Sequence, residues 1–195
     1  MLVTFEGPEA SGKSTQIELL RRLRPGLYLR DPGSTALGER IREILLHGED
    51  ISPEAEMYLF LAARAELVRA RVLPALARGE WVVLDRYHDS TIAYQGARGL
   101  ETWWPPSFPR PDLTVGLMLS PSAAAERLGA GPKDRIESAS IEFHERVLAQ
   151  FERLGRAEPE RWLMLDATLP EAELADRIWL RVRQLEETSR SRSLP

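Results

Sequence analysis

The chain has 195 residues, of which 43% are hydrophobic and 29% charged, and its formal net charge at pH 7 is −4. These values indicate one globular domain, and the acidic balance predicts no nucleic-acid partner. The sequence has no cysteine, which excludes disulfides and thiolate metal sites. No apolar run approaches the ~18 residues of a membrane span, and no signal peptide precedes the first predicted strand. We therefore expect no membrane partner and a cytoplasmic protein.

Short apolar runs alternate along the chain with segments of helical periodicity. The predicted strands are residues 2–5, 27–30, 81–84, 113–119 and 162–165. The predicted helices begin at residue 13 and then cover residues 35–46, 52–78, 90–97, 122–128, 138–154 and 171–187, with Pro74 bending the third. Strands separated by helices indicate an α/β fold in which a five-stranded parallel sheet lies between two layers of helices.

Two stretches are expected to lack regular structure. Residues 100–112 include two adjacent tryptophans and four prolines, which suggests a rigid cover or a subunit contact, and the sequence does not choose between them. The tail 189–195, SRSRSLP, is expected to be disordered. This leaves residues 1–188 as a single domain.

Residues 7–14, GPEASGKS, match the pattern G-x-x-x-x-G-K-[ST] between a predicted strand and a predicted helix. In this context Gly7 and Gly12 let backbone N–H groups turn toward a phosphate, and the helix N-terminus adds partial positive charge. Lys13 would reach the β- and γ-phosphates, and the Ser14 hydroxyl would ligate Mg²⁺. The predicted ATP-binding residues are Gly7, Pro8, Glu9, Ala10, Ser11, Gly12, Lys13, Ser14 and Thr15.

Polar residues follow the second and third predicted strands, at Asp31 and at Asp85-Arg86. In a parallel sheet these positions share one edge with the phosphate loop, where ligands bind. Guanine-reading GTPases need an N-K-x-D motif, and this chain has no asparagine at all. Translocating helicases and related motors are usually longer. The remaining class is a small kinase or a related phosphotransferase, with a P-loop fold and a short mobile lid that excludes water.

Several segments, in this order and spacing, resemble the thymidylate kinase family over nearly the whole chain. They are EGPEASGKST, RDPGSTALGERIREILL, EMYLFLAARAELV, PALARGEWVVLDRYHDSTIAYQGARGL, PDLTVGLML and DRIE with FHERV, and the block DRYHDSTIAYQG is the most specific. The resemblance implies transfer of the γ-phosphate of Mg-ATP to dTMP, giving dTDP for dTTP biosynthesis. It also implies a homodimer packed through helices.

The resemblance assigns roles around the acceptor phosphate and sugar. Arg86 would grip the dTMP phosphate, a role that suits the guanidinium fork. Glu9 would bond the sugar 3′-hydroxyl or position the metal region, and Asp85 would support Mg²⁺. Asp31 stands where a glutamate is common in bacterial members and would contact the sugar or metal. Arg42 would contact base or phosphate, unless it belongs to a solvated helix face.

The resemblance also assigns a pocket for the thymine base. Phe60 and Arg64 lie four residues apart on one helix, so they share a face. Phe60 would stack on thymine, although its pattern alone suggests core packing, and Arg64 would donate to thymine O4. Thr91 and Gln95, again four apart, would face the N3 edge. Tyr94 would fill the space of a ribose 2′-hydroxyl.

The segment 127–137, RLGAGPKDRIE, resembles the lid of this family, whose basic residues reach the γ-phosphate. Relatives place a catalytic arginine either in the phosphate loop or in the lid, and here the loop position holds Ala10. The lid must then supply the charge, from Arg135 or Lys133, with Arg127 further back. The candidate catalytic residues are Lys13, Arg86, Arg135, Glu9 and Lys133.

Two rival functions remain open at this point. A deoxynucleoside kinase would act on thymidine without its 5′-phosphate. A nucleotide-gated regulatory module would bind ATP tightly without turnover.

Overall fold

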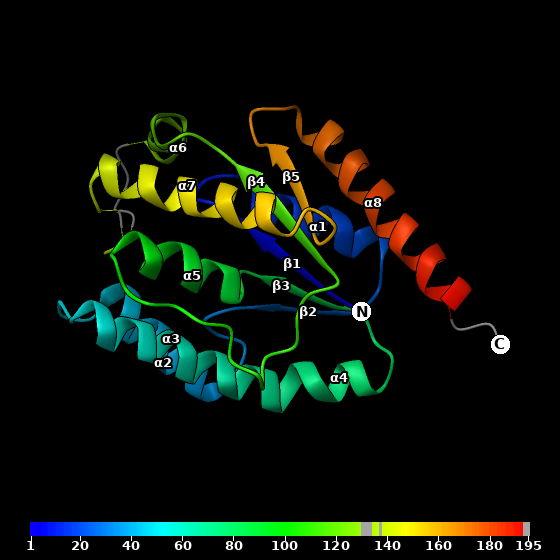
Figure 1. Cartoon of the computed structure of the whole chain (residues 1–195), viewed down its shortest axis with the longest axis horizontal. Coiled ribbons are helices and arrows are strands. Elements are labelled where there is room, and N and C mark those ends of the chain that lie inside the picture. Colours follow the sequence, from blue (N-terminus) through cyan, green and yellow to red (C-terminus); the bar gives the residue numbers. More distant parts are fainter. Residues whose placement is uncertain (130–133, 137, 193–195) are drawn as a thin grey trace.

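A five-stranded parallel sheet forms the centre of the molecule (Figure 1). The computed structural model describes residues 1–129, 134–136 and 138–192, the last four by their backbone alone. The strands are β1 (Leu2–Glu6), β2 (Leu27–Arg30), β3 (Val82–Asp85), β4 (Leu113–Met118) and β5 (Trp162–Asp166). Their order across the sheet is β2-β3-β1-β4-β5, so β1 lies in the middle.

Helices cover both faces of this sheet. They are α1 (Lys13–Leu23), α2 (Ala36–His47), α3 (Pro53–Leu67), the π-helix η1 (Val68–Val72), α4 (Leu73–Ala77), α5 (His88–Ala97), α6 (Pro121–Leu128), α7 (Ile141–Ala157) and α8 (Glu171–Arg192). Several begin at a residue whose side-chain oxygen accepts a backbone N–H of the first turn, which satisfies a donor left free by the helix. At the start of α3, for example, Ser52 Oγ accepts from the Ala55 N–H at 3.2 Å.

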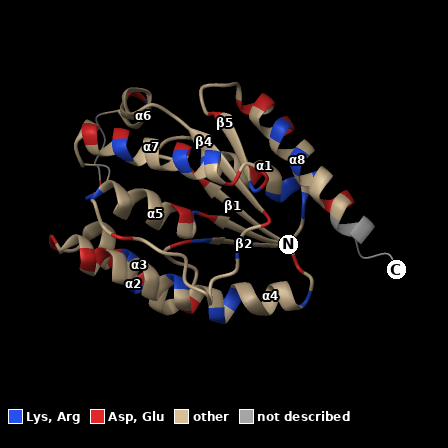
Figure 2. Cartoon of the chain, in the orientation of Figure 1, with Lys and Arg blue, Asp and Glu red and all other residues tan. Residues whose placement is uncertain are grey.

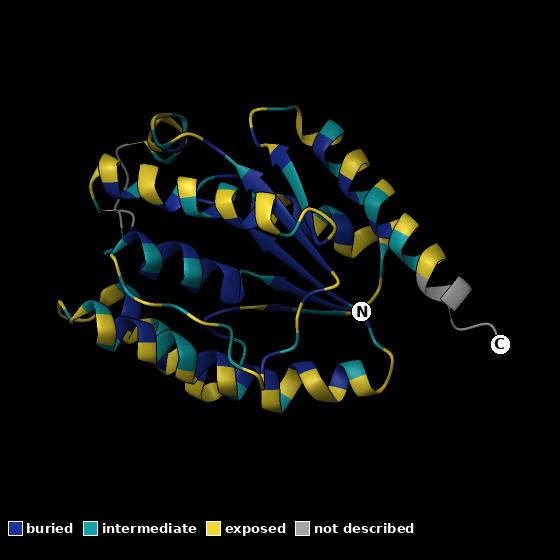
Figure 3. Ribbon diagram, viewed as in Figure 1, coloured by how far each residue is buried: buried dark blue, intermediate teal, exposed yellow. Residues whose placement is uncertain are grey.

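The two faces of the sheet bury different side chains because strand residues alternate. On one face Val3 and Phe5 pack with residues of α1 and α8. On the other, Leu2 packs with residues of α3, η1 and α4. A third apolar cluster joins α5 to α7. Figure 3 shows the strands buried between the helices, and the three-layer α/β prediction is confirmed.

Most differences from the predicted boundaries have local causes. The third predicted helix is continuous in the structure, but its middle is the π-helix η1. η1 lies just before Pro74, which lacks the N–H that an α-helix needs. α5 begins two residues earlier than predicted, at His88. α7 begins later, at Ile141, because the Ser140 side chain caps it.

The last helix is longer than predicted. α8 extends to Arg192 and so includes residues 189–192, which we expected in a disordered tail; residues 193–195 lie outside the described residues. No helix breaker interrupts the sequence from Glu171 to Arg192, and ion pairs such as Arg177–Glu173, four residues apart, support the helix. Figure 2 shows acidic and basic residues interspersed along α8.

The described part of the chain has no helix that is both long and apolar enough to cross a membrane. Residues 100–112 are irregular, as predicted, and their aromatic side chains Trp104 and Phe108 pack beside α5.

Candidate active site

The carboxyl ends of β1, β2 and β3 open into one cavity of about 690 Å³. The phosphate loop follows β1, Asp31 follows β2, and Asp85 ends β3. The cavity is lined by Glu9, Ala10, Ser11, Gly12, Lys13, Ser14, Thr15, Arg30, Asp31, Pro32, Arg42, Leu46, Phe60, Arg64, Asp85, Arg86, Ser90, Thr91, Tyr94, Gln95, Arg127, Asp134 and Ile136. The phosphate loop and the residues predicted for the acceptor therefore share one space, to which Gly7 and Pro8 contribute no lining.

The phosphate loop depends on its first glycine. Gly7 has a φ of 136°, and a Cβ added there would stand 2.2 Å from the carbonyl oxygen of Leu117 on β4. Only glycine fits so close to the neighbouring strand. The loop ends at Gly12, whose left-handed backbone leads into the first turn of α1 and leaves the N–H groups of that turn available to an anion.

Lys13 is buried at the start of α1, and its ammonium donates to the carbonyl of Pro8 at 2.7 Å and to that of Gly7 at 3.2 Å. Burial, with the nearby charge of Arg86, lowers the pKa of Lys13 to about 8. The lysine is thus held inside its own loop, where bound phosphates would compensate its charge.

Ser14 and Asp85 supply a pair of oxygen ligands suited to Mg²⁺. The Ser14 hydroxyl donates to Asp85 Oδ2 at 3.2 Å, so one cation can contact both. No group of three His, Asp or Glu side chains that could hold a metal occurs among the described residues. A magnesium ion commonly takes few protein ligands and completes its shell with phosphate oxygens and water, so this pair fits it.

Arg86 joins the phosphate loop to β3 and α5. Its backbone has a φ of 64°, and its Nη1 donates to the carbonyl of Gly7 at 2.9 Å and to Ser90 Oγ at 3.2 Å. Its Nη2 forms an ion pair with Glu9 and lies 3.4 Å from Tyr94 Oη. Burial would raise the pKa of Glu9, but the positive charges of Arg86 and Lys13 outweigh it and lower that pKa.

The predicted base pocket lies between α3 and α5. Phe60 lines the cavity and also packs on the apolar clusters behind it, so the two alternatives for this ring are compatible. Thr91, Tyr94 and Gln95 are buried and line the same cavity. Gln95 Nε2 donates to Glu56 Oε1 at 2.9 Å.

Arg64 is also buried in this pocket, and it forms an ion pair with Asp31. Burial raises the pKa of Asp31, while Arg64 opposes that rise. In this structure the carboxylate of Asp31 is therefore paired with Arg64 of the predicted base pocket. Arg42 lines the cavity half-buried and donates to the carbonyl of Pro32 at 3.2 Å, rather than lying on a solvated face.

The basic residues of the predicted lid occupy different places. Arg127 lines the cavity and bridges two loops, donating to the carbonyls of Ala10 at 3.1 Å and Ala167 at 2.8 Å. Arg135 does not line the cavity, because its guanidinium binds Glu56 and the carbonyl of Leu45. Lys133 lies outside the described residues.

Sequence reasoning missed two acidic residues that organise the site. Glu6, at the end of β1, accepts from the Tyr87 N–H at 2.8 Å and from Ser90 Oγ at 2.5 Å. Burial, with the neighbouring Asp89, raises the pKa of Glu6 to about 8. Glu56 on α3 links Gln95 to Arg135. An acid in a strand or on an apolar helix face is the signal that could have pointed to both, since buried carboxylates need partners.

Comparison with known proteins agrees with the geometry. The family model described as thymidylate kinase matches residues 5–178. Proteins named thymidylate kinase from Thermomicrobium roseum and Deinococcus radiodurans are each 45% identical to this chain, covering 96% and 94% of it and 97% of their own lengths. One from a Synechococcus species is 44% identical over 92% of each chain. The chain belongs to the thymidylate kinase family.

Proposed function

We propose that this protein phosphorylates dTMP to dTDP with the γ-phosphate of Mg-ATP, a step in dTTP biosynthesis. The observation that carries the proposal is the single cavity in which a phosphate loop meets a buried base pocket, with Arg86 between them. Membership of the thymidylate kinase family supports this activity. The cavity supports it too, because the proposed donor and acceptor residues line the same space.

The donor half is the phosphate loop. In the proposed complex its N–H groups and the N-terminus of α1 hold the β- and γ-phosphates, and Lys13 turns from the loop carbonyls toward them. Ser14 and Asp85 would hold Mg²⁺, which neutralises phosphate charge when bound. The other residues proposed to contact ATP are those of the loop from Gly7 to Thr15.

The acceptor half is formed by α3, α5 and the end of β3. We assign Phe60 to stacking on thymine, Arg64 to its O4, and Thr91 and Gln95 to its N3 edge. Tyr94 is assigned to the space beside the sugar 2′ position, and its ring is held by packing on Phe143 and Phe151 at centroid distances of 6.2 and 6.1 Å. Glu9 and Asp31 are assigned to the sugar or metal region, and Arg42 to base or phosphate.

Arg86 binds the acceptor phosphate in this proposal. An oxygen of that phosphate attacks the γ-phosphorus of ATP, the bond from the γ-phosphorus to the bridging oxygen breaks, and ADP leaves. Lys13 stabilises the charge that develops on the transferred group. Arg135 and Lys133 remain the proposed sources of further positive charge from the lid.

A panel of acceptors tests the function. Purified protein with Mg-ATP should phosphorylate dTMP far faster than AMP or GMP, and should leave thymidine untouched. Lys13→Ala, prepared in the same way, should show no turnover, which excludes a contaminating kinase. Preference for AMP or GMP would reject the proposal, phosphorylation of thymidine would favour a deoxynucleoside kinase, and tight ATP binding without turnover would favour a regulatory module.

We also propose a homodimer and a cytoplasmic location, as the family resemblance implies. Exposed apolar side chains on α2 and α3, Leu37, Ile44 and Tyr58, support the homodimer. Light scattering at micromolar concentration tests it, and a monomeric mass would reject it.

A further inference from the structure

His88 is a buried histidine that connects the base pocket to the irregular segment 100–112. It is the first residue of α5 and is 1% exposed. Its Nε2 lies 2.6 Å from the carbonyl oxygen of Trp103, and its Nδ1 lies 3.0 Å from Arg64 Nη1. The rings of Trp104 and Phe108 meet the imidazole edge-on, with centroids 4.8 and 5.6 Å away.

The two contacts allow only one form of the imidazole. An arginine nitrogen can only donate, so His88 Nδ1 must be the acceptor and carries no proton. A carbonyl oxygen can only accept, so Nε2 must carry the proton and donate it to Trp103. Burial, reinforced by the charge of Arg64, lowers the pKa of His88 to about 3, which keeps the ring neutral at physiological pH.

The same contact helps to fix the guanidinium of Arg64. Its Nε binds Asp31, and its Nη1 donates to Thr91 Oγ1 at 2.7 Å as well as to His88. No bond within the described residues uses its remaining nitrogen, Nη2. Because a guanidinium is planar, holding Nε and Nη1 also sets the direction of the Nη2 donors.

We propose that His88 is a positioning residue for base recognition, which anchors Arg64 to segment 100–112 so that its Nη2 is held for the 4-keto oxygen of the pyrimidine. This inference rests on the proposed function, since it needs a thymine in the pocket. In this arrangement the rings of Trp104 and Phe108 and the Trp103 carbonyl form a wall against His88 at the start of α5.

Two variants of His88 separate its two bonds. In His88→Asn the amide oxygen can stand where Nδ1 stood and still accept from Arg64. In His88→Gln the longer amide reaches toward the place of Nε2, so the bond to Arg64 is lost. The matched controls are His47→Asn and His47→Gln, at an exposed histidine that ends α2.

The readouts are KM and kcat for dTMP, KM for ATP, and the kcat/KM ratio of dTMP to dCMP, which carries an amino group in place of the 4-keto oxygen. For His88→Gln we expect KM for dTMP to rise about tenfold and the dTMP to dCMP ratio to fall by a similar factor, as loss of one hydrogen bond to a charged group implies. KM for ATP should not change. His88→Asn can still accept from Arg64 but no longer reaches the Trp103 carbonyl, so its KM and ratio should lie between those of wild type and His88→Gln. If His88→Gln folds and keeps the wild-type KM and ratio, the proposal is wrong. If the wild type does not use dTMP at all, the proposed function has failed instead.

A measurement on the unmodified protein covers the case in which His88→Gln does not fold. The chain has three histidines, so ¹⁵N-labelled imidazole signals can be assigned with the His47 and His144 variants. We expect His88 to be neutral and protonated at Nε2 from pH 6 to 8, and its Nδ1 signal to shift on addition of dTMP. A charged ring, a proton on Nδ1, or no response to dTMP would overturn the proposal.

Discussion

Arg86 and Glu9 form an ion pair that ties the end of β3 to the phosphate loop. Both side chains are largely buried in the cavity wall, and the arginine also donates to the Gly7 carbonyl inside the same loop. The pair therefore links the proposed donor site in the phosphate loop to the proposed acceptor site at the end of β3. In the proposed reaction the acceptor phosphate competes with Glu9 for Arg86. The carboxylate of Glu9 is then free to accept a hydrogen bond from the sugar hydroxyl.

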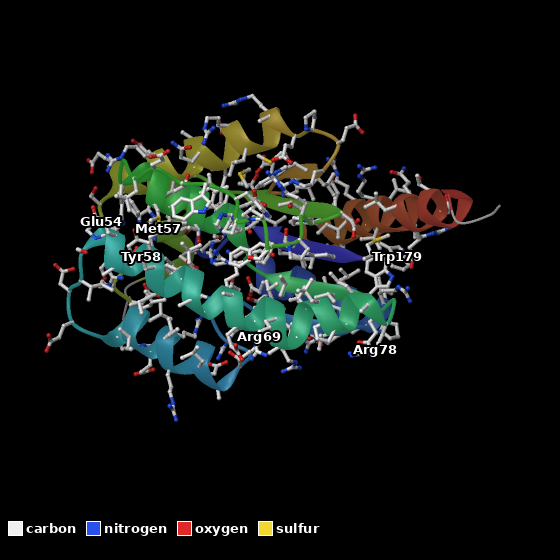
Figure 4. The ribbon with its side chains drawn as sticks, turned by 60° about the horizontal axis from the view of Figure 1, so that its bottom comes forward. Glu54, Met57, Tyr58, Arg69, Arg78 and Trp179 are labelled. Atoms are coloured by element: carbon white, nitrogen blue, oxygen red, sulfur yellow. The ribbon has the colours of Figure 1, made fainter. Side chains whose placement is uncertain are left out.

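We expect Arg86→Lys to lower kcat/KM for dTMP on the order of 100-fold, because lysine keeps the charge but loses the two-pronged contact to phosphate. ATP binding, measured by calorimetry, should stay within a few-fold of wild type. The control is Arg78→Lys, at an exposed residue that directly follows α4. Glu54 lies at the start of α3, and Arg78 lies at the opposite end of the continuous helix formed by α3, η1 and α4 (Figure 4). An equal loss of ATP and dTMP binding would contradict the assignment.

Replacing Tyr94 should relax the selection against ribose. Tyr94→Ala opens space beside the proposed sugar site, so the kcat/KM ratio of dUMP to UMP, two substrates that differ only at the 2′ position, should fall at least about tenfold. Tyr94→Phe keeps the ring and loses only the hydroxyl that lies near Arg86, so it should preserve the ratio. An unchanged ratio in Tyr94→Ala would refute the role of the ring.

Arg135 offers a test of the lid. If it supplies charge to the transferred phosphate, Arg135→Ala should lower kcat far more than KM, because the contact forms only in the transition state. Its removal also takes one ion-pair partner from the buried carboxylate of Glu56, which keeps Arg98 at 3.6 Å, and this loss lowers stability as well. The double variant Arg135→Ala with Glu56→Gln removes that complication. Unchanged kcat in both would move the catalytic role to Lys133.

The pKa of Lys13 predicts a loss of activity at alkaline pH. The folded, ligand-free protein holds this pKa near 8, below the ordinary 10.5, so the ammonium is lost above pH 8. Because kcat/KM reports the free enzyme, its value for ATP should fall about tenfold per pH unit above 8, whereas kcat at saturating ATP should hold to higher pH. Unfolded Lys13 keeps its proton up to about pH 10.5, so this residue makes unfolding less favourable as pH rises from 8 to 10.5. A flat kcat/KM up to about pH 9.5 would contradict the low pKa.

The sequence predicted the fold well because its signals are local. Each strand is a short apolar run, and the phosphate loop is set by glycines and by the strand and helix around it. The predicted loop and acceptor residues from Glu9 to Gln95 line one cavity, because strand ends in a parallel sheet meet at one edge.

Partners that depend on packing across elements were not predictable in the same way. The pairs Arg135–Glu56 and Arg64–His88 join residues from separate elements, and no local spacing encodes them. The end of α8 differs from the prediction because a serine- and arginine-rich composition resembles a disordered tail, although residues 189–192 contain neither glycine nor proline.

The strand that carries the phosphate loop is made before both of the strands that pair with it. β1 lies in the middle of the sheet, where Leu2 pairs with Val82 and Val3 with Leu113. While the chain leaves the ribosome, β1 therefore has both edges open until β3 emerges, and one edge open until β4 emerges. The nascent chain would thus gain its nucleotide site late, and an apolar strand with two open edges is a natural target for chaperones until that moment.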